Sequence, residues 1–336
     1  MLVRMGEVTN RNFVLPMLLF YPTSQCNSRC ISCDWWKQSG AGDMTIDEIA
    51  CVARALPALG TRLVAFSGGE PLLRPDVFVA ADLFKSHGLE LHLLTSGVLL
   101  ERSAHSVAEY FTRVTVSLDA STEELYQAVR GVAALAVVGR GVDRLRRYAR
   151  SLPITARATL HRANYRELPR LIDQARTMGF DGISFLAADV SSNAFGRDGQ
   201  IDSRPLTLDA EAISEFRELV ERTIVTHRVD FDSGFVLDSP GKLRRLPQYY
   251  AALAGQSPFP DTNCNAPWVS VVLEANGDVR PCFFHPAVGN VRRAPLETIL
   301  AENLRPFRGS LDVHENAVCR TCVCSIKTSW RSAPWQ

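Results

Sequence analysis

The sequence predicts an α/β protein whose parallel strands are joined by helical crossovers, with a small cysteine-rich region at the end. Two observations predict this class. Short apolar runs alternate with helix-like stretches about six times before residue 228, and the alternation then stops. Eight of the nine cysteines lie in two groups, one near each end of the chain. The alternation is typical of a barrel or a doubly wound sheet, whose ligands bind at the carboxyl ends of the strands.

The elements follow from local signals taken in chain order. Strands are expected where short apolar runs occur, at residues 15–21, 63–66, 89–94, 113–118, 154–160 and 182–186. Helices are expected at residues 45–56, 75–87, 135–150, 165–178 and 208–226. Thr45 and Glu48 form a capping-box pattern at the start of the first helix. Gly179 ends the fourth helix, because glycine is favoured just past a helix C-terminus.

After residue 228 the pattern changes. A strand is expected at Val229–Leu237, and a hairpin joins residues 268–273 to 278–281 through the Asn-Gly pair at Gly277. We therefore divide the chain into a barrel at 10–228, a linker region at 229–258 and a cysteine-rich domain at 259–330. A short cysteine-bearing segment of this kind depends on metal for much of its stability.

Composition excludes several classes of protein. Hydrophobic residues make up 46% of the chain and charged residues 22%, enough apolar material for a large core. The net charge of +1 gives no sign of a nucleic-acid partner. No apolar run is long enough to span a bilayer, and no signal peptide is evident. We expect a cytoplasmic protein without a membrane partner, whose reduced cysteines bind metal or react.

The first cysteine group has the spacing of an iron–sulfur site. Cys26, Cys30 and Cys33 form the string CNSRCISC, and three thiolates on a four-iron cluster leave one iron open to another ligand. A structural zinc ion needs a fourth protein ligand, and Asp34 is poorly placed to supply it. Cys51 stands apart in a helix-like stretch, where we expect it to be a small buried residue.

The triplet together with Ser67-Gly68-Gly69-Glu70-Pro71 resembles the radical S-adenosylmethionine (SAM) family of enzymes. The resemblance implies a partial (β/α)6 TIM-like barrel. It also implies that the open iron chelates SAM, and that an electron from the reduced cluster releases a 5′-deoxyadenosyl radical that abstracts a substrate hydrogen. A flavodoxin or ferredoxin-type protein would supply that electron.

The resemblance also implies a set of SAM-binding residues. The ammonium group would meet Glu70 and the glycine backbone, the carboxylate would meet Ser117 and Arg130, and Ser96 would lie near the ribose. The full set is Gly68, Gly69, Glu70, Ser96, Ser117 and Arg130. Ser32 departs from the family pattern, which has an aromatic residue before the third cysteine. Trp35 or Trp36 is a candidate substitute that would pack on the adenine.

The second cysteine group resembles the auxiliary-cluster domain called twitch or, in its longer form, SPASM. Its pattern is C-x12-G-x4-C followed by CxxC. The resemblance implies one auxiliary [4Fe-4S] cluster, and thus two clusters in all. The expected ligands are Cys264, Cys282, Cys319 and Cys322. Cys324 is left as an alternative ligand, a bystander or a hydrogen-atom donor. A structural zinc ion is the alternative at this site. A saturated cluster suits electron transfer.

We therefore expect a radical SAM oxidoreductase that dehydrogenates a sugar or aminocyclitol, with the auxiliary cluster as electron acceptor. A peptide maturase or radical epimerase is the enzyme alternative, and an iron–sulfur electron carrier is the alternative from another class. Cys26 lies too near the start for a leader-peptide-binding domain to precede it, which favours a small molecule. The end of the chain lacks the terminal Gly-Gly of the molybdopterin-pathway member. No general base is identified; Asp189, His161 and Asp238 are loop candidates.

Overall fold

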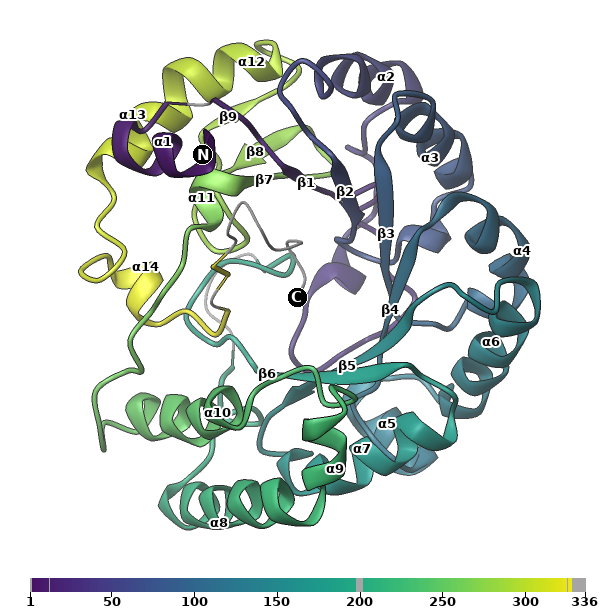
Figure 1. The fold of residues 1–336 in the computed structure, drawn as a ribbon, viewed down its shortest axis with the longest axis vertical. Coiled ribbons are helices and arrows are strands. Elements are labelled where there is room, and N and C mark those ends of the chain that lie inside the picture. The colour runs from purple at the N-terminus through teal and green to yellow at the C-terminus, as the bar shows by residue number, and fades with distance from the viewer. Residues whose placement is uncertain (1, 12, 198–201, 325, 328–336) are drawn as a thin grey trace.

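The computed structural model describes residues 2–11, 13–197, 202–324 and 326–327. Within these residues nine strands form one sheet in the order β6-β5-β4-β3-β2-β1-β7-β8-β9. The strands from β6 to β7 are parallel, and β8 and β9 are antiparallel additions. Figure 1 shows the sheet curled into an open arc, with crossover helices around its outer side. The predicted partial barrel is confirmed.

The strands and helices of the described chain have the following bounds. The strands are β1 Met17–Phe20, β2 Leu63–Phe66, β3 Glu90–Thr95, β4 Arg113–Ser117, β5 Ile154–Leu160, β6 Gly182–Ala187, β7 Ser270–Leu273, β8 Asp278–Arg280 and β9 Gly289–Asn290. The α-helices are α1 Leu2–Thr9, α2 Ile46–Ala55, α3 Val77–Ser86, α4 Leu100–Tyr110, α5 Glu123–Arg130, α6 Leu135–Tyr148, α7 Leu168–Thr177, α8 Ala210–Thr226, α9 Arg228–Asp232, α10 Pro240–Leu253, α11 Ala266–Val269, α12 Leu296–Thr298, α13 Arg305–Ser310 and α14 Ala317–Arg320.

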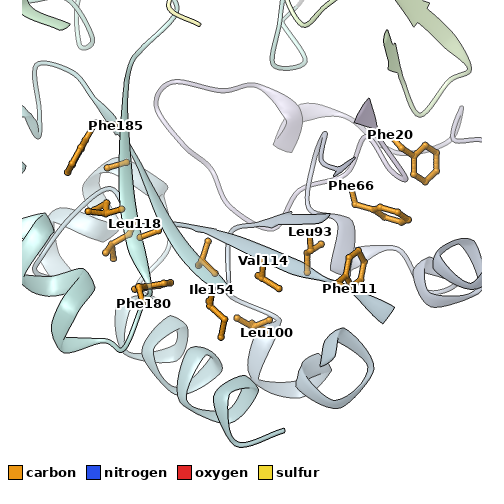
Figure 2. Packing of buried hydrophobic residues seen from close by; sticks show 14 of the residues in the cluster. Phe20, Phe66, Leu93, Leu100, Phe111, Val114, Leu118, Ile154, Phe180 and Phe185 are labelled. Atoms are coloured by element: carbon orange, nitrogen blue, oxygen red, sulfur yellow. The ribbon is translucent and has the colours of Figure 1, made fainter. Parts of the chain in front are cut away.

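The main core lies between the sheet and the surrounding helices. Figure 2 shows its side chains, which point outward from the strands toward the helices. Aromatic rings fill the layer behind β1 and β2: Phe20 and Phe66 stack edge to face with ring centroids 5.2 Å apart. The predicted capping box opens α2, because Thr45 Oγ1 accepts from the Glu48 amide and Glu48 accepts from the Thr45 amide. This packing fixes the strand ends where the site forms.

The C-terminal region extends the barrel sheet. β7 pairs with β1 in parallel, with Met17 opposite Ser270 and Phe20 opposite Leu273. The predicted hairpin then joins β7 to β8, and Gly277 adopts the left-handed conformation (φ 88°) that its turn requires. The expected hairpin and helices of the cysteine-rich region are thus present. No helix in the described part of the chain is long and apolar enough to cross a membrane.

Two sequence expectations were wrong. Val229–Leu237 is not a strand, because residues 228–232 form α9 and only Val236 makes a β-bridge, to Ile183. Cys51 is exposed on α2 rather than buried, with its sulfur 3.1 Å from Arg54 Nη2. The segment predicted as a linker, 229–258, contains α9 and α10.

Candidate functional site

The predicted site residues gather where parallel strands end. The first cysteine loop follows β1, Gly68 and Gly69 follow β2, Ser96 follows β3, and Ser117 ends β4. Adjacent pairing places the four strand ends side by side. The carboxyl edge of a parallel sheet is the usual ligand site of such folds, because the connecting loops there are free to vary. The rim of the barrel therefore carries the candidate site.

The glycines bring the end of β2 directly onto the cysteine loop. The Gly69 amide donates to Thr23 O at 3.2 Å, and the Glu70 amide donates to Gln25 O at 2.8 Å. A Cβ atom on Gly69 would lie 2.0 Å from Gln25 O, closer than any real contact. Gly68 adopts φ +94°, which side chains of L residues rarely allow. These glycines are therefore required by the loop itself.

Glu70 is completely buried and ties two strand ends together. Its Oε1 accepts hydrogen bonds from the Leu72 amide at 3.1 Å and from Thr95 Oγ1 at 2.7 Å. Its Oε2 accepts from the Ser96 amide at 2.7 Å. The structure thus places Glu70 and Ser96 in direct contact. This role in joining β2 to β3 was not foreseen from the sequence.

Arg130 and Asp119 form a buried ion pair beside the cysteine loop. Arg130 Nη1 lies 2.9 Å from Asp119 Oδ2, and the other oxygen of Asp119 accepts from the Thr159 amide at 2.7 Å. The loop is held from the same side, because the Arg29 amide donates to Arg130 O at 2.8 Å. Against the effect of burial, the negative charge of a Cys30 thiolate raises the pKa of the Arg130 guanidinium. Asp119 therefore positions Arg130, a role that the sequence analysis left unassigned.

The three thiols of the first loop fit an iron–sulfur cluster by their chemistry. All are free and half-buried, and burial raises the pKa of Cys26 to about 11 and that of Cys33 to about 12. Cluster binding would therefore release protons. Asn27 Oδ1, Ser28 Oγ and Arg130 Nε are buried with no hydrogen-bond partner among the described residues. Such unsatisfied atoms indicate a missing ligand.

In the described chain, no three His, Cys, Asp or Glu side chains converge as the ligands of a single ion would. The thiolates of a four-iron cluster bind separate iron atoms and need not converge on one point.

The tryptophans after the loop have separate surroundings. Trp35 stacks edge to face on Tyr21, with ring centroids 5.7 Å apart. Trp36 is exposed, and the cations of Arg29 and Lys37 lie over its ring at 5.9 and 5.3 Å. Trp35 therefore faces the inner side of the barrel, and Trp36 lies on the surface. The packing of either ring on adenine stays a prediction.

The second cysteine group comes together from distant segments. The negative charges of the Cys264 and Cys319 thiolates contribute to the raised pKa of Cys282. Those of Cys282 and Cys264 contribute in the same way to the raised pKa of Cys322. Burial is the main cause of their raised pKa values, which reach about 12 for Cys282 and about 11 for Cys319. The four predicted ligands thus lie within electrostatic reach of one another, and all are free thiols.

Two further side chains join this second group. Cys324 lies beside Cys322, whose sulfur is 3.3 Å from the Cys324 amide. His285 is buried, with Nε2 3.3 Å from Cys319 Sγ. Burial lowers the pKa of His285, so its imidazole is neutral. A neutral imidazole N–H beside a sulfur is a hydrogen-bond donor to a cluster ligand.

The loop after β6 connects the two cysteine groups. Arg197 and Asp189 form an ion pair at 2.6 Å, and both side chains are 1% exposed. Arg197 Nη2 also donates to Ser32 O at 2.8 Å, inside the first cysteine loop. On the other side, Ser191 Oγ lies 3.2 Å from Thr321 Oγ1, between Cys319 and Cys322. We call residues 189–197 the clasp loop.

None of the three candidate bases is a free proton acceptor. Asp189 is held by Arg197, and Asp238 Oδ1 lies 2.6 Å from Lys242 Nζ. His161 is buried, and burial lowers its pKa to about 4. Its Nδ1 accepts from the Ala163 amide at 3.2 Å, so the proton sits on Nε2, which has no partner in the described chain. His161 is thus arranged as a donor.

A polar cavity of about 390 Å³ is lined by Ser24 and Trp35, which flank the first cysteine loop, and by Arg197. Glu274 and Arg280, from the β7–β8 hairpin, also line it and form an ion pair at 3.0 Å. Burial raises the pKa of Glu274. The cavity has the size of a small-molecule site and a lining suited to hydroxyl or charged groups.

Comparisons with known proteins agree with this site. A model of the radical SAM superfamily matches residues 20–175, and one of an iron–sulfur cluster-binding domain, SPASM, matches residues 264–323. The chain is 35% identical over 127 residues to "Probable GTP 3',8-cyclase" of Archaeoglobus fulgidus, covering 36% of this chain and 42% of that protein. It is 27% identical over 249 residues to GTP 3',8-cyclase of Marinobacter nauticus, covering 72% of each. The chain spans about half the length of the first curated relatives it matches.

A solved structure shares the fold. Streptococcus suis SuiB bound to S-adenosylmethionine matches with a TM-score of 0.65 at 15% identity, covering 96% of this chain and 76% of that one. At this identity the likeness establishes the fold alone. The two family models cover both cysteine groups, and they imply SAM and two [4Fe-4S] clusters as cofactors. The chain therefore carries a radical SAM superfamily domain over residues 20–175 and a C-terminal SPASM iron–sulfur cluster-binding domain over residues 264–323.

Proposed function

We propose that this enzyme oxidises a carbinol carbon of a polar small molecule of the sugar or aminocyclitol class. When bound, SAM and the reduced first cluster supply the 5′-deoxyadenosyl radical that removes the carbon-bound hydrogen atom. The resulting substrate radical would lose the hydroxyl proton to solvent and one electron to the auxiliary cluster, and so become a carbonyl compound. The observation that carries the proposal is the polar cavity beside the first cysteine loop, which is sized for a small molecule.

The proposal includes residue assignments. Cys26, Cys30 and Cys33 would hold the SAM-binding cluster, and Arg130 and Ser117 would meet the SAM carboxylate. The auxiliary cluster would take Cys264, Cys282, Cys319 and Cys322. The corresponding domains are the barrel at 10–228, the linker region at 229–258 and the auxiliary domain at 259–330. The electrostatic coupling among these four C-terminal thiols supports the second assignment, because a saturated cluster needs four ligands in one region.

The first test separates the two cluster sites. Anaerobically reconstituted enzyme should hold about eight iron atoms, and the Cys26→Ala/Cys30→Ala/Cys33→Ala variant about four. That variant should release no 5′-deoxyadenosine with dithionite and SAM, yet keep the electron paramagnetic resonance signal of the other cluster. Cys51→Ala removes an exposed cysteine outside both groups and should match the wild type. A triple variant that keeps all its iron would disprove the assignment.

The second test addresses the net reaction. A panel of sugars, sugar phosphates and aminocyclitols is incubated with SAM and reductant. Dehydrogenation predicts one 5′-deoxyadenosine per carbonyl product and little net consumption of reductant, because each turnover returns an electron. A product at the same oxidation level as the substrate would overturn the proposed oxidation.

Radical epimerisation is the second candidate, and Cys324 favours it. This fifth thiol lies beside a group that needs only four ligands. A thiol near the substrate could return a hydrogen atom to the opposite face of the carbon, and the thiyl radical left behind would regain an electron from the added reductant and a proton from solvent. Epimerisation predicts that product formed in deuterated water carries deuterium at that carbon, and that Cys324→Ala abolishes this incorporation while still cleaving SAM. A Cys324→Ala variant that makes normal product would remove this candidate.

A further inference from the structure

The inner face of the barrel is divided into an apolar half and a polar half. β1, β2 and β7 contribute an apolar cluster that includes Met17, Leu19, Ala65 and Val272. β4 and β5 place Val114, Ile154 and their alternate neighbours in the outer core, so the residues between them face inward. Those inward residues are largely hydroxylated or basic. A ligand entering the barrel therefore meets polar groups on one side only.

Hydrogen bonds across the strands confirm which side chains share the inner face. His92 Nε2, Thr115 Oγ1 and Thr155 Oγ1 form a chain with both links at 2.9 Å. Two residues further along β5, Arg157 Nε donates to Ser184 Oγ on β6 at 3.2 Å. The register sets Arg157 opposite Ser117 on β4 and Ser184 on β6. Arg157 thus lies on the inner face, next to the rim.

The charge of Arg157 is not neutralised by the described part of the protein. Arg130 is paired with Asp119 at 2.9 Å and Arg197 with Asp189 at 2.6 Å, whereas no carboxylate of the described residues forms an ion pair with Arg157. Its side chain is half-buried. A guanidinium held in such a recess without a counter-charge favours an anion, and its planar fork matches the oxygens of a carboxylate or phosphate.

Arg157 and Arg130 lie at different places on the rim. Arg130 lies beside the first cysteine loop, because the Arg29 amide donates to Arg130 O at 2.8 Å. Arg157 instead donates to Ser184 on β6, the strand that leads into the clasp loop. A group bound at Arg157 would therefore lie toward the β6 side of the barrel.

We propose that Arg157 binds an anionic group, a carboxylate or phosphate, of the substrate inside the barrel. This inference rests on the proposed function and narrows its substrate class to acidic or phosphorylated small molecules. An aminocyclitol is disfavoured, because its ammonium group would face a like charge. The same chemistry could serve the carboxylate of SAM, so the test must separate the two sources.

The test uses pyrophosphate and succinate as probes on reconstituted enzyme saturated with SAM. Isothermal titration compares wild type with Arg157→Gln, Arg157→Lys and the surface control Arg140→Gln. Loss of charge-assisted hydrogen bonds predicts that Arg157→Gln weakens binding of the better probe by about tenfold or more. Arg157→Lys keeps the charge without the fork and should bind with intermediate affinity. Arg140→Gln should bind as wild type, because Arg140 pairs with Glu101 on the surface.

A separate arm measures SAM affinity in the same variants, which should stay within about threefold of wild type. If Arg157→Gln weakens SAM binding and leaves the probe unaffected, Arg157 serves the cofactor and the proposal is overturned. Equal probe affinity in wild type and both Arg157 variants, or no probe binding by wild type, also overturns it. Iron content and circular dichroism check folding, and Arg157→Lys decides the matter if Arg157→Gln fails to fold. No turnover is needed, so the proposed oxidation can fail independently.

Discussion

At the residue scale, Gly69 shows how a ligand-binding motif also serves the protein's own loop. The sequence analysis assigned this glycine to close approach of a ligand. The structure shows that its backbone is pressed against Gln25, one residue before the first cysteine. Any side chain at this position must displace the loop that carries the thiols. Glycine is therefore needed at this position partly to allow the packing of the cysteine loop, and not only to bind a ligand.

Gly69→Ala should destabilise the apo-protein and disrupt the first cluster site. Overpacking against a backbone atom costs roughly 1–3 kcal/mol of unfolding free energy, measured by urea denaturation. Reconstituted iron should fall toward the content of one cluster. Gly42→Ala is the matched control, because nothing lies within 4 Å of its added Cβ. Equal stability and iron content in both variants would show that the cysteine loop can move away from the added methyl group, and would contradict the prediction.

His161 makes stability depend on pH through a buried neutral imidazole. Its pKa is about 4 in the folded protein, because burial penalises the charged form, against about 6.5 when unfolded. The unfolded state therefore takes up protons first, so this contribution is present above pH 6.5 and lost as the pH falls toward 4.

The apo-protein should lose stability on the order of a few kcal/mol from His161 between those pH values. Urea denaturation at several pH values should show a shallower pH slope for His161→Gln than for wild type. His314→Gln, at an exposed position, should keep the wild-type slope. An unchanged slope in His161→Gln would contradict the assignment.

At the element scale, the clasp loop holds the two cysteine groups against each other. It does so through the buried ion pair of Arg197 and Asp189. From the sequence, Asp189 was only a candidate base in a loop, and Arg197 was not singled out. Arg197→Met should cost about 3–5 kcal/mol of unfolding free energy, because Asp189 is left as an unpaired buried charge. Asp189→Asn/Arg197→Met should recover part of that loss. Reaction of apo-protein thiols with a disulfide reagent should become faster in the single variant.

The control for this variant is Arg204→Gln. Arg204 pairs with Asp202 on an exposed stretch, where an ion pair is screened by water and salt. Its stability and thiol reactivity should match those of wild type. If Arg197→Met matches it in both measurements, the clasp loop does not hold the site together.

Local signals predicted most of the barrel elements and missed those that depend on packing. The strand over residues 63–66 and the capping box at Thr45 were foreseen because their cues lie within a few residues. The sequence analysis did not predict the helices α4 and α5, because each buries only a few apolar residues and polar residues dominate both. The site residues likewise fall into those that local sequence predicts and those that it does not. Cysteine spacing is local, whereas Arg157, Asp119 and the clasp loop gain meaning only when separate strands meet.

At the scale of the whole molecule, one sheet carries both cysteine groups. Sequence reasoning separated the barrel from the auxiliary domain, and that division stays a prediction. It did not foresee that β7 would complete the barrel arc beside β1. The partner of a strand cannot be predicted from local sequence in such a case, because backbone N–H and C=O groups form the same hydrogen bonds whatever the side chains are. The two cysteine groups are thus set on a common frame.

This shared frame has a consequence for biosynthesis. β1 is translated before α2 to α11 and its neighbour β2, whereas its second neighbour, β7, is translated after all of them. Throughout that interval the nascent barrel presents an apolar strand with one bare edge, the kind of surface that attracts other polypeptides. Synthesis of β7 closes that edge and comes with the second set of thiols, so maturation of both metal sites waits for this later part of the chain.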